Sequence, residues 1–371
     1  MSAQATFNRA ARVLAQISPD QPADAVLRRE LGALRRISPA ERRAIARTVF
    51  AYFRWRQWLD GKGSAQAQLA EADRLQDRFD ADPAAIKPQA LAARAVPDWV
   101  HSEVEFSPDD LRALQREPVL WLRARAERAK GVARALRQVQ PAPPPCDTTG
   151  LAYSGERDLY RTPEFHAGDF EIQDLASQLV GHACAAQPGE VWWDACAGEG
   201  GKMLHLADQM NNKGLIWATD RSNRRLDRLR DRTARAKVFN YRAINWNGGP
   251  HLPTKTLFDG ILVDAPCSGV GTWRRNPHSR WTTTLADVQE LAGLQRQILD
   301  SLAHSLKPGG RLIYAVCTLT RTETTAIADA FGADHPDLEP LPLLGRGPQV
   351  FLRPAEFDAN GMFLAGWRRT S

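Results

Sequence analysis

The strongest constraint on the fold is a short apolar run without polar alternation, Gly260-Ile-Leu-Val263. A strand of this kind is buried on both faces, as in a parallel sheet that is covered by helices. Ligands of open α/β sheets bind at the carboxyl ends of such strands. The residues that follow this strand are Asp264, Pro266, Cys267, the turn Ser268-Gly269-Val270-Gly271, and the arginines Arg274 and Arg275. The sequence therefore predicts a carboxylate, a thiol and guanidinium groups at one edge of a parallel sheet.

Further segments have the composition of strands in the same sheet. The predicted strands are Trp192–Ala195, Leu215–Thr219, Val238–Ala243 and Arg311–Val316. The turn Lys307-Pro-Gly-Gly310 precedes the last of them. A terminal antiparallel hairpin is predicted to pair Phe351–Arg353 with Met362–Arg368. Leu285–Leu306 predicts a long helix, and Thr320 with Glu323 predicts a capping box for the helix after the fifth strand. Strands that alternate with helices are typical of an α/β fold.

A glycine-rich turn follows the first of these strands, in Asp194-Ala-Cys-Ala-Gly-Glu-Gly-Gly-Lys202. Glycines at a strand-to-helix turn let the backbone approach a ligand closely. Met203 occupies the sixth position of a Gly-x-Gly-x-x-Gly pattern, so a pyrophosphate-binding dinucleotide loop is disfavoured. Asp220, at the end of the second strand, is suited to accept hydrogen bonds from ribose hydroxyls.

Residues 1–95 predict an all-helical domain. Ser38-Pro39-Ala40-Glu41 is a capping box with proline at the first helical position. Apolar residues then recur at helical spacing; they are Ile45, Val49, Tyr52 and Phe53, joined by Phe50, Trp55 and Trp58. We interpret these aromatic side chains as the core of a helical bundle, in preference to a platform for stacking bases.

The formal net charge of +6 is concentrated near the N-terminus. Residues 1–60 hold 11 arginines against 5 acidic residues, whereas residues 141–371 hold 25 basic and 26 acidic side chains. A local basic excess favours a nucleic-acid partner, although a solvated helical surface is the alternative. The arginines expected on the outside are Arg28, Arg29, Arg35, Arg36, Arg42, Arg43 and Arg47.

The middle of the chain predicts a linker and a small α/β unit. Asp80–Pro97 is rich in alanine and proline, which is typical of a linker. A helix is expected from Ser107, a strand over Val119–Ala124 and an arginine-rich helix to Val139, before a stiff connector at Pro141–Pro145. The predicted domains are thus 1–95, 96–161 and 162–371.

Composition limits the class of protein. A chain of 371 residues is long enough for two or three domains, and no apolar run reaches the ~18 residues of a membrane span. The N-terminus has no apolar segment typical of a secretory signal, and five cysteines without framework spacing favour a reducing compartment, so we expect a cytoplasmic protein. Histidines and cysteines show no metal-ligand spacing, so no metal is expected, and Cys146, Cys184 and Cys196 are interpreted as structural.

Asp264-Ala-Pro-Cys-Ser268, with the glycine turn and Arg274-Arg-Asn-Pro277, resembles the fourth motif of the RsmB/Sun family of RNA cytosine-C5 methyltransferases. Val316-Cys317-Thr318 is similar to the family's Thr-Cys-Ser, and Glu323-Thr324-Thr325 to its Glu-Asn-Glu. An earlier family motif, a turn that leads into a helix under the active site, is matched by Pro163, Phe165, Gly168, Phe170, Gln173, Asp174 and Ser177. The chain departs from the family at Gly198 and Glu199, at Thr324 and Thr325, and at Asn247, where the family has an aspartate that recognises adenine.

The resemblance implies a class I S-adenosylmethionine-dependent methyltransferase domain: a Rossmann-like, mostly parallel sheet with a terminal antiparallel hairpin. It also implies a NusB-like RNA-binding helical domain in front of it and a small α/β unit with further RNA contacts. The expected cofactor is S-adenosylmethionine, and the expected partner is RNA, with ribosomal RNA of the small subunit as the first candidate. The protein is expected to be a monomer. The cofactor-binding residues expected by resemblance are Cys196, Ala197, Gly198, Glu199, Gly200, Gly201, Lys202, Asp220, Asn247 and Asp264.

The resemblance also implies roles in catalysis. Cytosine C5 is too weak a nucleophile to accept a methyl group until a thiolate adds at C6. Cys317 is the expected nucleophile, Cys267 is expected to assist breakdown of the adduct, and Asp264 is expected to hold the ring by N3 and N4. The target nucleotide must be single-stranded or flipped out.

Alternative functions stay open at this point. A DNA cytosine-C5 methyltransferase would use Cys267 as the nucleophile, and a tRNA enzyme would share the chemistry. A non-enzymatic RNA-binding or ribosome assembly factor on the same scaffold is favoured by the departures at Glu199, Asn247 and Thr324.

Overall fold

The protein is represented by a computed structural model that describes residues 3–34, 37–61, 63–146 and 148–370. The chain forms two compact units: residues 1–118 with 269–285, called the helical unit, and residues 119–268 with 286–371, called the sheet unit. The predicted segments 1–95, 96–161 and 162–371 divide the chain differently. Within the described ranges, no helix combines the length and the hydropathy that a membrane crossing requires.

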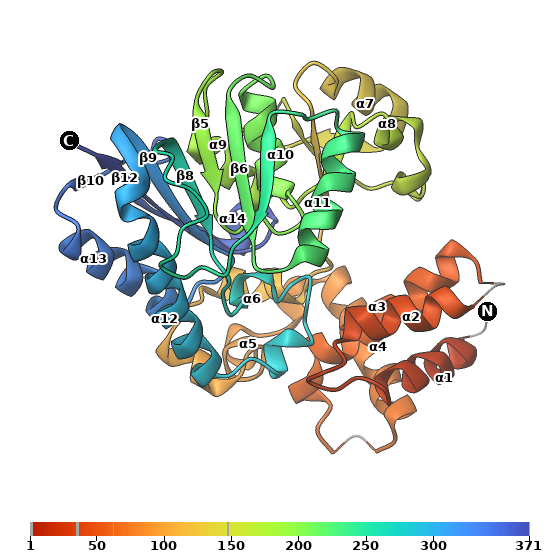
Figure 1. Cartoon of the computed structure of the whole chain (residues 1–371). Helices are drawn as coiled ribbons and strands as arrows, with labels where there is room; N and C mark the ends of the chain where they lie inside the picture. Colours follow the sequence, from red (N-terminus) through yellow and green to blue (C-terminus); the bar gives the residue numbers. More distant parts are fainter. Residues whose placement is uncertain (1–2, 35–36, 62, 147, 371) are drawn as a thin grey trace. The chain divides into compact units, whose positions relative to one another are not determined.

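The helical unit contains no named strand among its described residues. Its helices are α1 (Ala3–Leu14), α2 (Ala23–Ala33), α3 (Pro39–Arg54), α4 (Ala65–Ala81), α5 (Pro88–Arg94) and α6 (Pro108–Gln115), with short 3-10 turns η1 (Arg56–Trp58), η2 (Pro83–Ala85), η3 (Asp98–Ser102), η5 (Val270–Thr272) and η6 (Ser279–Trp281) (Figure 1). The capping box of α3 is confirmed, because Ser38 Oγ accepts from the Glu41 N–H and the Glu41 carboxylate accepts from the Ser38 N–H. The linker predicted over Asp80–Pro97 is wrong: it contains α5, whose Leu91 is fully buried.

The arginines expected on the outside of this unit divide into two groups. Arg47 forms ion pairs with Asp73, Asp77, Asp80 and Glu117, at 2.7 to 3.1 Å. Arg42 donates to two backbone carbonyls where α2 ends. These two arginines therefore stabilise the fold, whereas Arg28 remains largely exposed. Arg35 and Arg36 lie outside the described residues.

Residues 269–285 follow the fourth-motif cysteine in sequence but pack within the helical unit. Arg280 is fully buried there and donates to the carbonyls of Ala95 and Leu114, at 2.7 and 2.9 Å. The Trp281 indole donates to the carbonyl of Phe53 at 2.6 Å. Buried carbonyls need donors, so this segment completes the helical unit.

The sheet unit is built on a large, mostly parallel sheet. Its strands are β5 (Val191–Asp194), β6 (Leu215–Asp220), β7 (Tyr241–Asn245), β8 (Phe258–Asp264), β9 (Leu306–Val316), β10 (Leu338–Pro340), β11 (Gln349–Leu352) and β12 (Met362–Arg369). The order is β10-β12-β9-β8-β5-β6-β7, with β11 paired to β12 (Figure 1). β7, β6, β5, β8 and β9 are parallel and β12 is antiparallel to β9. The predicted α/β fold and terminal hairpin are confirmed.

Helices cover both faces of this sheet. On one face of the sheet, the core contains residues of α9 (Leu175–Cys184), α10 (Gly201–Gln209) and α11 (Asn223–Arg235). On the other face, it contains residues of α12 (Leu285–Leu302) and α13 (Thr325–Asp334). The unit also has the short helix α14 (Pro354–Phe357) and the 3-10 turns η7 (Ala303–Ser305) and η8 (Arg321–Glu323). Trp192 and Trp193, adjacent on β5, pack into the two opposite cores. Two buried faces explain the absence of polar alternation in these strands.

A second, antiparallel sheet precedes the large one in the chain. It has the order β2-β3-β1-β4, from β1 (Leu120–Ala124), β2 (Val139–Pro141), β3 (Gly150–Tyr153) and β4 (Phe170–Ile172), with α7 (Ala129–Leu136), the turn η4 (Leu159–Arg161) and α8 (Pro163–His166). The predicted strand and helix before residue 139 are confirmed. β4, however, belongs to the segment that we assigned to the catalytic domain, so the small sheet extends past residue 161.

Two predicted strand boundaries differ from the structure. Residues 236–238 end α11 in a turn with Lys237 at φ 55°, so the strand predicted over Val238–Ala243 begins only at Tyr241. β9 begins at Leu306 because the Pro-Gly-Gly turn forms an irregularity inside the strand: Phe258 pairs with Leu306, and Gly260 pairs with Arg311. The helix predicted to Leu306 ends at Leu302.

Candidate active site

The two cysteines singled out in the sequence meet at the carboxyl edge of the sheet. β8 and β9 are neighbouring parallel strands, with Asp264 opposite Ala315. Cys267 lies three residues beyond the end of β8 and Cys317 directly follows β9, and their sulfur atoms are 3.3 Å apart. The prediction that both thiols reach one site is confirmed, whereas their separate roles remain predictions.

Lys202 and Asp264 form an ion pair beside the thiols. Lys202, in the first turn of α10, places Nζ 2.7 Å from Asp264 Oδ2, and both side chains are mostly buried. Burial lowers the pKa of Lys202, but Asp264 and then the Cys317 thiolate raise it, and the net pKa is raised. The ammonium charge in turn favours the thiolate form of Cys317.

Asp194 is a buried carboxylate at the start of the glycine-rich turn. It is 1% exposed, and neither oxygen has a hydrogen bond of good geometry within the described part of the chain, although the Cys196 backbone N–H lies close enough to stabilise its charge. Burial, followed by the negative charge of Asp264, raises the pKa of Asp194 to about 8. Since buried carboxylates are normally paired, this group is a candidate partner for a cationic ligand atom.

The glycine-rich turn is anchored to the acid at the end of β6. Gly198 and Gly200 have φ values of 56° and 85°, which only glycine adopts easily. A Cβ atom on Gly198 would meet nothing within 4 Å, so this side of the turn is open. Asp220 Oδ2 accepts from the Gly198 N–H at 3.1 Å and Oδ1 accepts from the Ser222 N–H at 2.7 Å. Asp220 thus holds the turn in addition to its predicted role toward a ribose.

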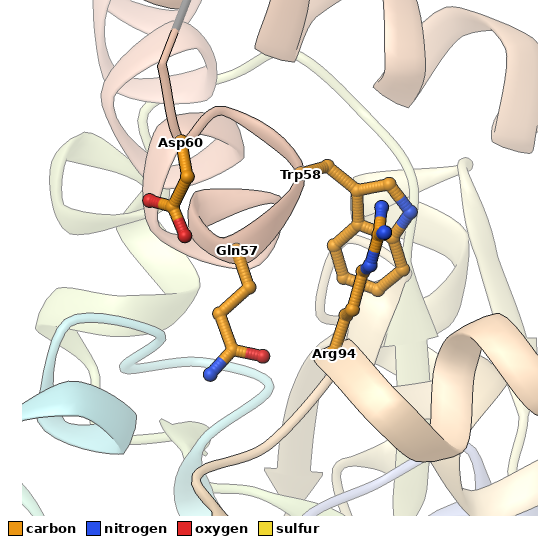
Figure 2. Close-up of a pocket in the computed structure, with 4 residues that line it drawn as sticks. All are labelled: Gln57, Trp58, Asp60 and Arg94. Carbon is orange, nitrogen blue, oxygen red and sulfur yellow. The ribbon is translucent and has the colours of Figure 1, made fainter.

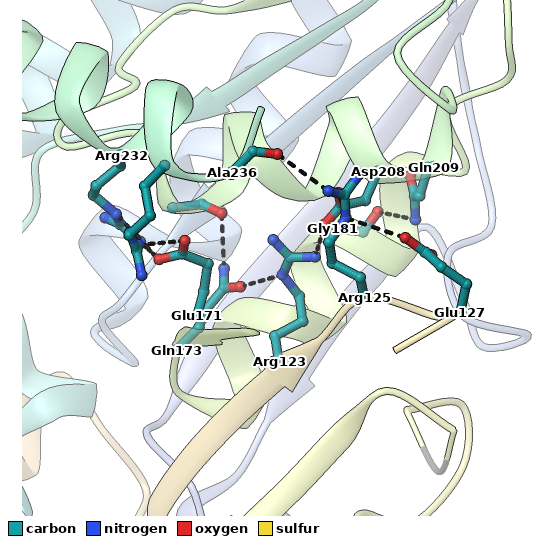
Figure 3. Close-up of polar contacts among 12 residues, drawn as sticks. Arg123, Arg125, Glu127, Glu171, Gln173, Gly181, Asp208, Gln209, Arg232 and Ala236 are labelled. Atoms are coloured by element: carbon teal, nitrogen blue, oxygen red, sulfur yellow. Dashed lines mark hydrogen bonds and ion pairs between the residues drawn. The ribbon is translucent and has the colours of Figure 1, made fainter. Parts of the chain in front are cut away.

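Glu199, a departure from the family pattern, is neutralised by helix α11. Its carboxylate pairs with Arg228, and its carbonyl accepts from Arg232 at 3.0 Å. Arg232 also pairs with Glu171 on β4, as Figure 3 shows. The extra negative charge is therefore directed toward α11 and compensated there.

Gln173 connects the small sheet to the glycine-rich turn. Its side-chain oxygen accepts from Arg123 on β1 at 2.8 Å, and its amide donates to the Gly201 carbonyl at 3.3 Å (Figure 3). Asp174 caps α9 and also accepts from the Asn360 N–H. The motif over residues 163–177 therefore contacts the glycine-rich turn through a hydrogen bond to Gly201.

Two predicted positions are placed differently from expectation. Asn247 is exposed, and its Oδ1 accepts from the Gly249 N–H at 3.0 Å, so that oxygen stabilises a turn; contact with adenine stays a prediction. Arg274, expected at the sheet edge, is instead buried in the helical unit, where it donates to the Glu117 carbonyl at 2.6 Å.

The remaining cysteines have the character of structural residues. Cys146 and Cys184 are fully buried. Burial, then the charge of Asp194, raises the pKa of Cys184, and the same two causes raise that of Cys196 well above its ordinary value. Such thiols stay protonated and unreactive.

Glu323 is a buried hub that sequence reasoning assigned wrongly. Its Oε1 accepts from the Ser268 N–H at 2.8 Å and from Gln295 at 3.0 Å, and its Oε2 accepts from the hydroxyls of Ser268 and Thr320. The predicted capping box is absent, because no side chain caps η8 and Thr320 donates to the carboxylate instead. The sequence signals were its position close to Cys317 and its match to the first glutamate of the family's Glu-Asn-Glu.

The hub also fixes the segment after Cys317. Thr318 shares a hydrogen bond with Ser268, and the single proton of the Tyr314 hydroxyl is shared between Gln295 Oε1 and the Glu323 carbonyl, at 2.9 and 2.7 Å. Thr324, where the family has asparagine, is buried and donates to the Thr320 carbonyl at 2.6 Å. The change at residue 324 therefore leaves a satisfied side chain.

Replacement of Glu323 should destabilise the sheet unit and displace both cysteines. Glu323→Ala leaves several buried donors unpaired and should lower the free energy of unfolding by about 3 kcal/mol or more. Glu323→Gln keeps one acceptor oxygen and should lose clearly less. Urea denaturation of the two variants and the wild type measures the difference; equal losses for alanine and glutamine would contradict the role of the carboxylate.

Asp194 should make stability depend on pH. Because its pKa is raised from 3.8 to about 8, the folded chain keeps a proton that the unfolded chain has lost, so the free energy of unfolding decreases as pH rises through this interval. Asp194→Asn is neutral at every pH and should therefore lose less stability between about pH 6 and about pH 9 than the wild type. Denaturation curves at both values test this, and identical pH dependence in both proteins would refute it.

Comparisons with known proteins agree with this geometry. The sequence model of 16S rRNA methyltransferase RsmB/F matches residues 182–367. The chain is 33% identical over 235 residues to "Probable ribosomal RNA small subunit methyltransferase B" of Synechocystis, covering 59% of this chain and 52% of that protein. It is 36% identical over 229 residues to "Ribosomal RNA small subunit methyltransferase F" of Escherichia coli, covering 57% and 47%.

The chain thus spans about half the length of these curated relatives. Among solved structures, that of PH0851 superposes with a TM-score of 0.81 at 22% identity and covers 100% of both chains, which supports the fold. Another, a methyltransferase homolog from Pyrococcus horikoshii, has a TM-score of 0.63 at 28% identity and covers 71% of this chain and 90% of that one. From the family match and the class I methyltransferase fold, the chain belongs to the RsmB/F family of 16S rRNA methyltransferases.

Proposed function

We propose that this protein methylates C5 of a cytosine in RNA, using S-adenosylmethionine and a covalent bond between Cys317 and C6. The observation that carries the proposal is the pair of sulfur atoms 3.3 Å apart beside the Lys202–Asp264 ion pair. The small-subunit rRNA is the first candidate substrate, because the relatives are named for it. A tRNA remains the nearest alternative, and we expect the reaction to take place in the cytoplasm.

The residues around the glycine-rich turn fit S-adenosylmethionine. The orphaned carboxylate of Asp194 suits the cofactor's ammonium group, and Asp220 suits its ribose hydroxyls. The open side of Gly198 leaves room for the ligand. When bound, the cofactor supplies an electrophilic methyl group on a sulfonium sulfur.

The surroundings of the two thiols favour Cys317 as the nucleophile. Lys202 interacts with the Cys317 thiolate, which lowers the cost of forming it. Cys267 lies instead near Tyr314, whose pKa is raised well above its ordinary value by burial and then by the charge of Cys267. The charge of Lys202 beside the Cys317 thiolate supports the assignment of Cys317 as the nucleophile.

The proposed reaction begins with the Cys317 thiol in its ionised form. The Cys317 thiolate adds to C6 of cytosine, and the electron pair moves into the ring, where Asp264 holds N3 and N4. Bound S-adenosylmethionine would supply the methyl group to C5, with cleavage of the bond between methyl carbon and sulfonium sulfur and release of S-adenosylhomocysteine. Loss of the C5 proton to a base and departure of the Cys317 thiolate from C6 restore the aromatic ring, and Cys267 assists this release.

The alternative of a non-enzymatic RNA-binding factor rested on three departures from the family pattern. Two of them are compensated, because Glu199 pairs with Arg228 and Thr324 is hydrogen-bonded. The DNA-type alternative, with Cys267 as the nucleophile, is disfavoured by the position of Lys202. An enzyme acting through Cys317 is therefore the proposal that the geometry supports best.

The two cysteine variants distinguish these alternatives. Cys317→Ala should abolish methylation and any covalent complex, because C5 is not activated. Cys267→Ala should still form the adduct and transfer the methyl group, but release is slowed, so a denaturant-resistant protein–RNA band should accumulate with RNA and S-adenosylmethionine. A denaturing gel measures this. An adduct that survives Cys317→Ala but is lost in Cys267→Ala would indicate the DNA-type arrangement, and no adduct with any protein would favour the non-enzymatic factor.

Asp220 should contribute to cofactor affinity. Asp220→Ala removes the acceptors proposed for the ribose and the anchor of Gly198, and should weaken S-adenosylmethionine binding by about 1–3 kcal/mol. Asp227→Ala, which changes an exposed acid on α11, is the matched control and should leave the affinity unchanged. Calorimetry with both folded variants decides, and wild-type affinity in Asp220→Ala would remove Asp220 from the cofactor site.

A further inference from the structure

The helical unit contains a pocket that the proposed reaction does not use. It has a volume of about 470 Å³, within the range of small-ligand sites, and is lined by Gln57, Trp58, Asp60 and Arg94. Figure 2 shows these side chains around it, three from the turn after α3 and Arg94 from the end of α5. In the described part of the chain, none of their side-chain polar groups has a hydrogen bond or ion pair.

The aromatic wall of this pocket packs against a buried, hydrogen-bonded tryptophan. Trp58 is half-buried, and its ring stands edge-on to that of Trp55, with 5.1 Å between ring centroids. Trp55 is fully buried and donates from its indole to Gln76, which in turn donates to Asp80 and to the Gln115 carbonyl. Of these two tryptophans, Trp55 is therefore the core residue that we predicted, whereas Trp58 presents part of its aromatic surface to the pocket.

The backbone next to Arg94, the basic residue of the pocket, is held by a hydrogen bond. The carbonyl of Ala95, next to Arg94, accepts from the buried Arg280 at 2.7 Å. Arg94 itself is exposed and free to contact a ligand. A phosphate is the natural partner of such a guanidinium.

From these four groups we infer that the pocket binds one unpaired guanine nucleotide of the RNA substrate. An indole face stacks on any base. A carboxylate such as Asp60 has two acceptor oxygens, which match the adjacent N1–H and N2–H donors of guanine, whereas adenine, cytosine and uracil offer no such pair of adjacent donors. The Gln57 amide can donate to guanine O6, and Arg94 can hold the phosphate.

This inference rests on the proposed function, because it takes RNA as the substrate. It adds a specificity element that lies in the helical unit and contains none of the reacting residues. The pocket would recognise a guanine in a single-stranded part of the RNA, separate from the cytosine that is methylated.

Binding of short RNAs to the full-length protein tests the inference without cofactor or catalysis. The probes are fluorescein-labelled oligouridines of about nine nucleotides, either unmodified in sequence or with one central guanosine or adenosine. By fluorescence anisotropy, the wild type should bind the guanosine probe about tenfold more tightly than the adenosine probe. Equal affinity for these two probes would overturn the inference.

Variants of the pocket locate the effect. Asp60→Asn should abolish the preference for guanosine over adenosine, because an amide offers only one acceptor. Trp58→Leu should weaken binding of every probe several-fold, and Trp58→Phe should restore most of it. Asp20→Asn, an exposed acid outside the pocket, is the matched control and should behave as the wild type. Thermal denaturation checks that each variant folds. A guanosine preference that survives both Asp60→Asn and Trp58→Leu would show that the pocket is not the site.

The results of these experiments distinguish a failure of the guanine pocket from a failure of the proposed methyl-transfer reaction. Methylation with no guanosine preference would overturn the pocket and leave the enzyme intact. A guanosine preference that depends on Asp60, in a protein that forms no adduct, would support the pocket and contradict the proposed reaction.

Discussion

The arrangement of the candidate active site depends on one buried carboxylate. Glu323 accepts hydrogen bonds from Ser268, Gln295 and Thr320, and so joins the segment after β8, helix α12 and the segment after β9. Neither cysteine segment has regular secondary structure of its own. Without a common acceptor, the two thiols would lie at the ends of two independent loops. Glu323 holds both segments, and thereby sets the distance between the two sulfur atoms.

A second constraint is the buried, unpaired carboxyl group of Asp194, which favours a positively charged ligand. Asp194 and Asp264 are both carboxylates near Lys202, but only Asp264 is paired with it. The raised pKa of Asp194 reflects the cost of this arrangement in the protein alone. A ligand with a positive charge would remove that cost, so the same feature that destabilises the free protein favours binding.

Continuity of the chain links the two units. Ser268 is held by Glu323 in the sheet unit, and the next residue begins the segment that completes the helical unit through Arg280 and Trp281. The motif that carries Cys267 therefore serves both units. It also explains why Arg274, in the same motif, is buried in the helical unit, where it donates to the Glu117 carbonyl.

The sequence by itself determined the sheet and the meeting of the cysteines. Apolar runs buried on both faces predict parallel strands, and residues that follow neighbouring parallel strands must share an edge, so Asp264, Cys267 and Cys317 converge as expected. What only the tertiary structure decided is the partner of each polar group. Glu323 resembled a helix cap, Arg47 a surface charge and Trp58 a core residue, because local spacing carries no information about contacts with residues far along the chain. Burial and ion pairing depend on those distant contacts. In the folded chain, Glu323 accepts hydrogen bonds from three segments, Arg47 pairs with four acidic residues, and Trp58 lines a pocket.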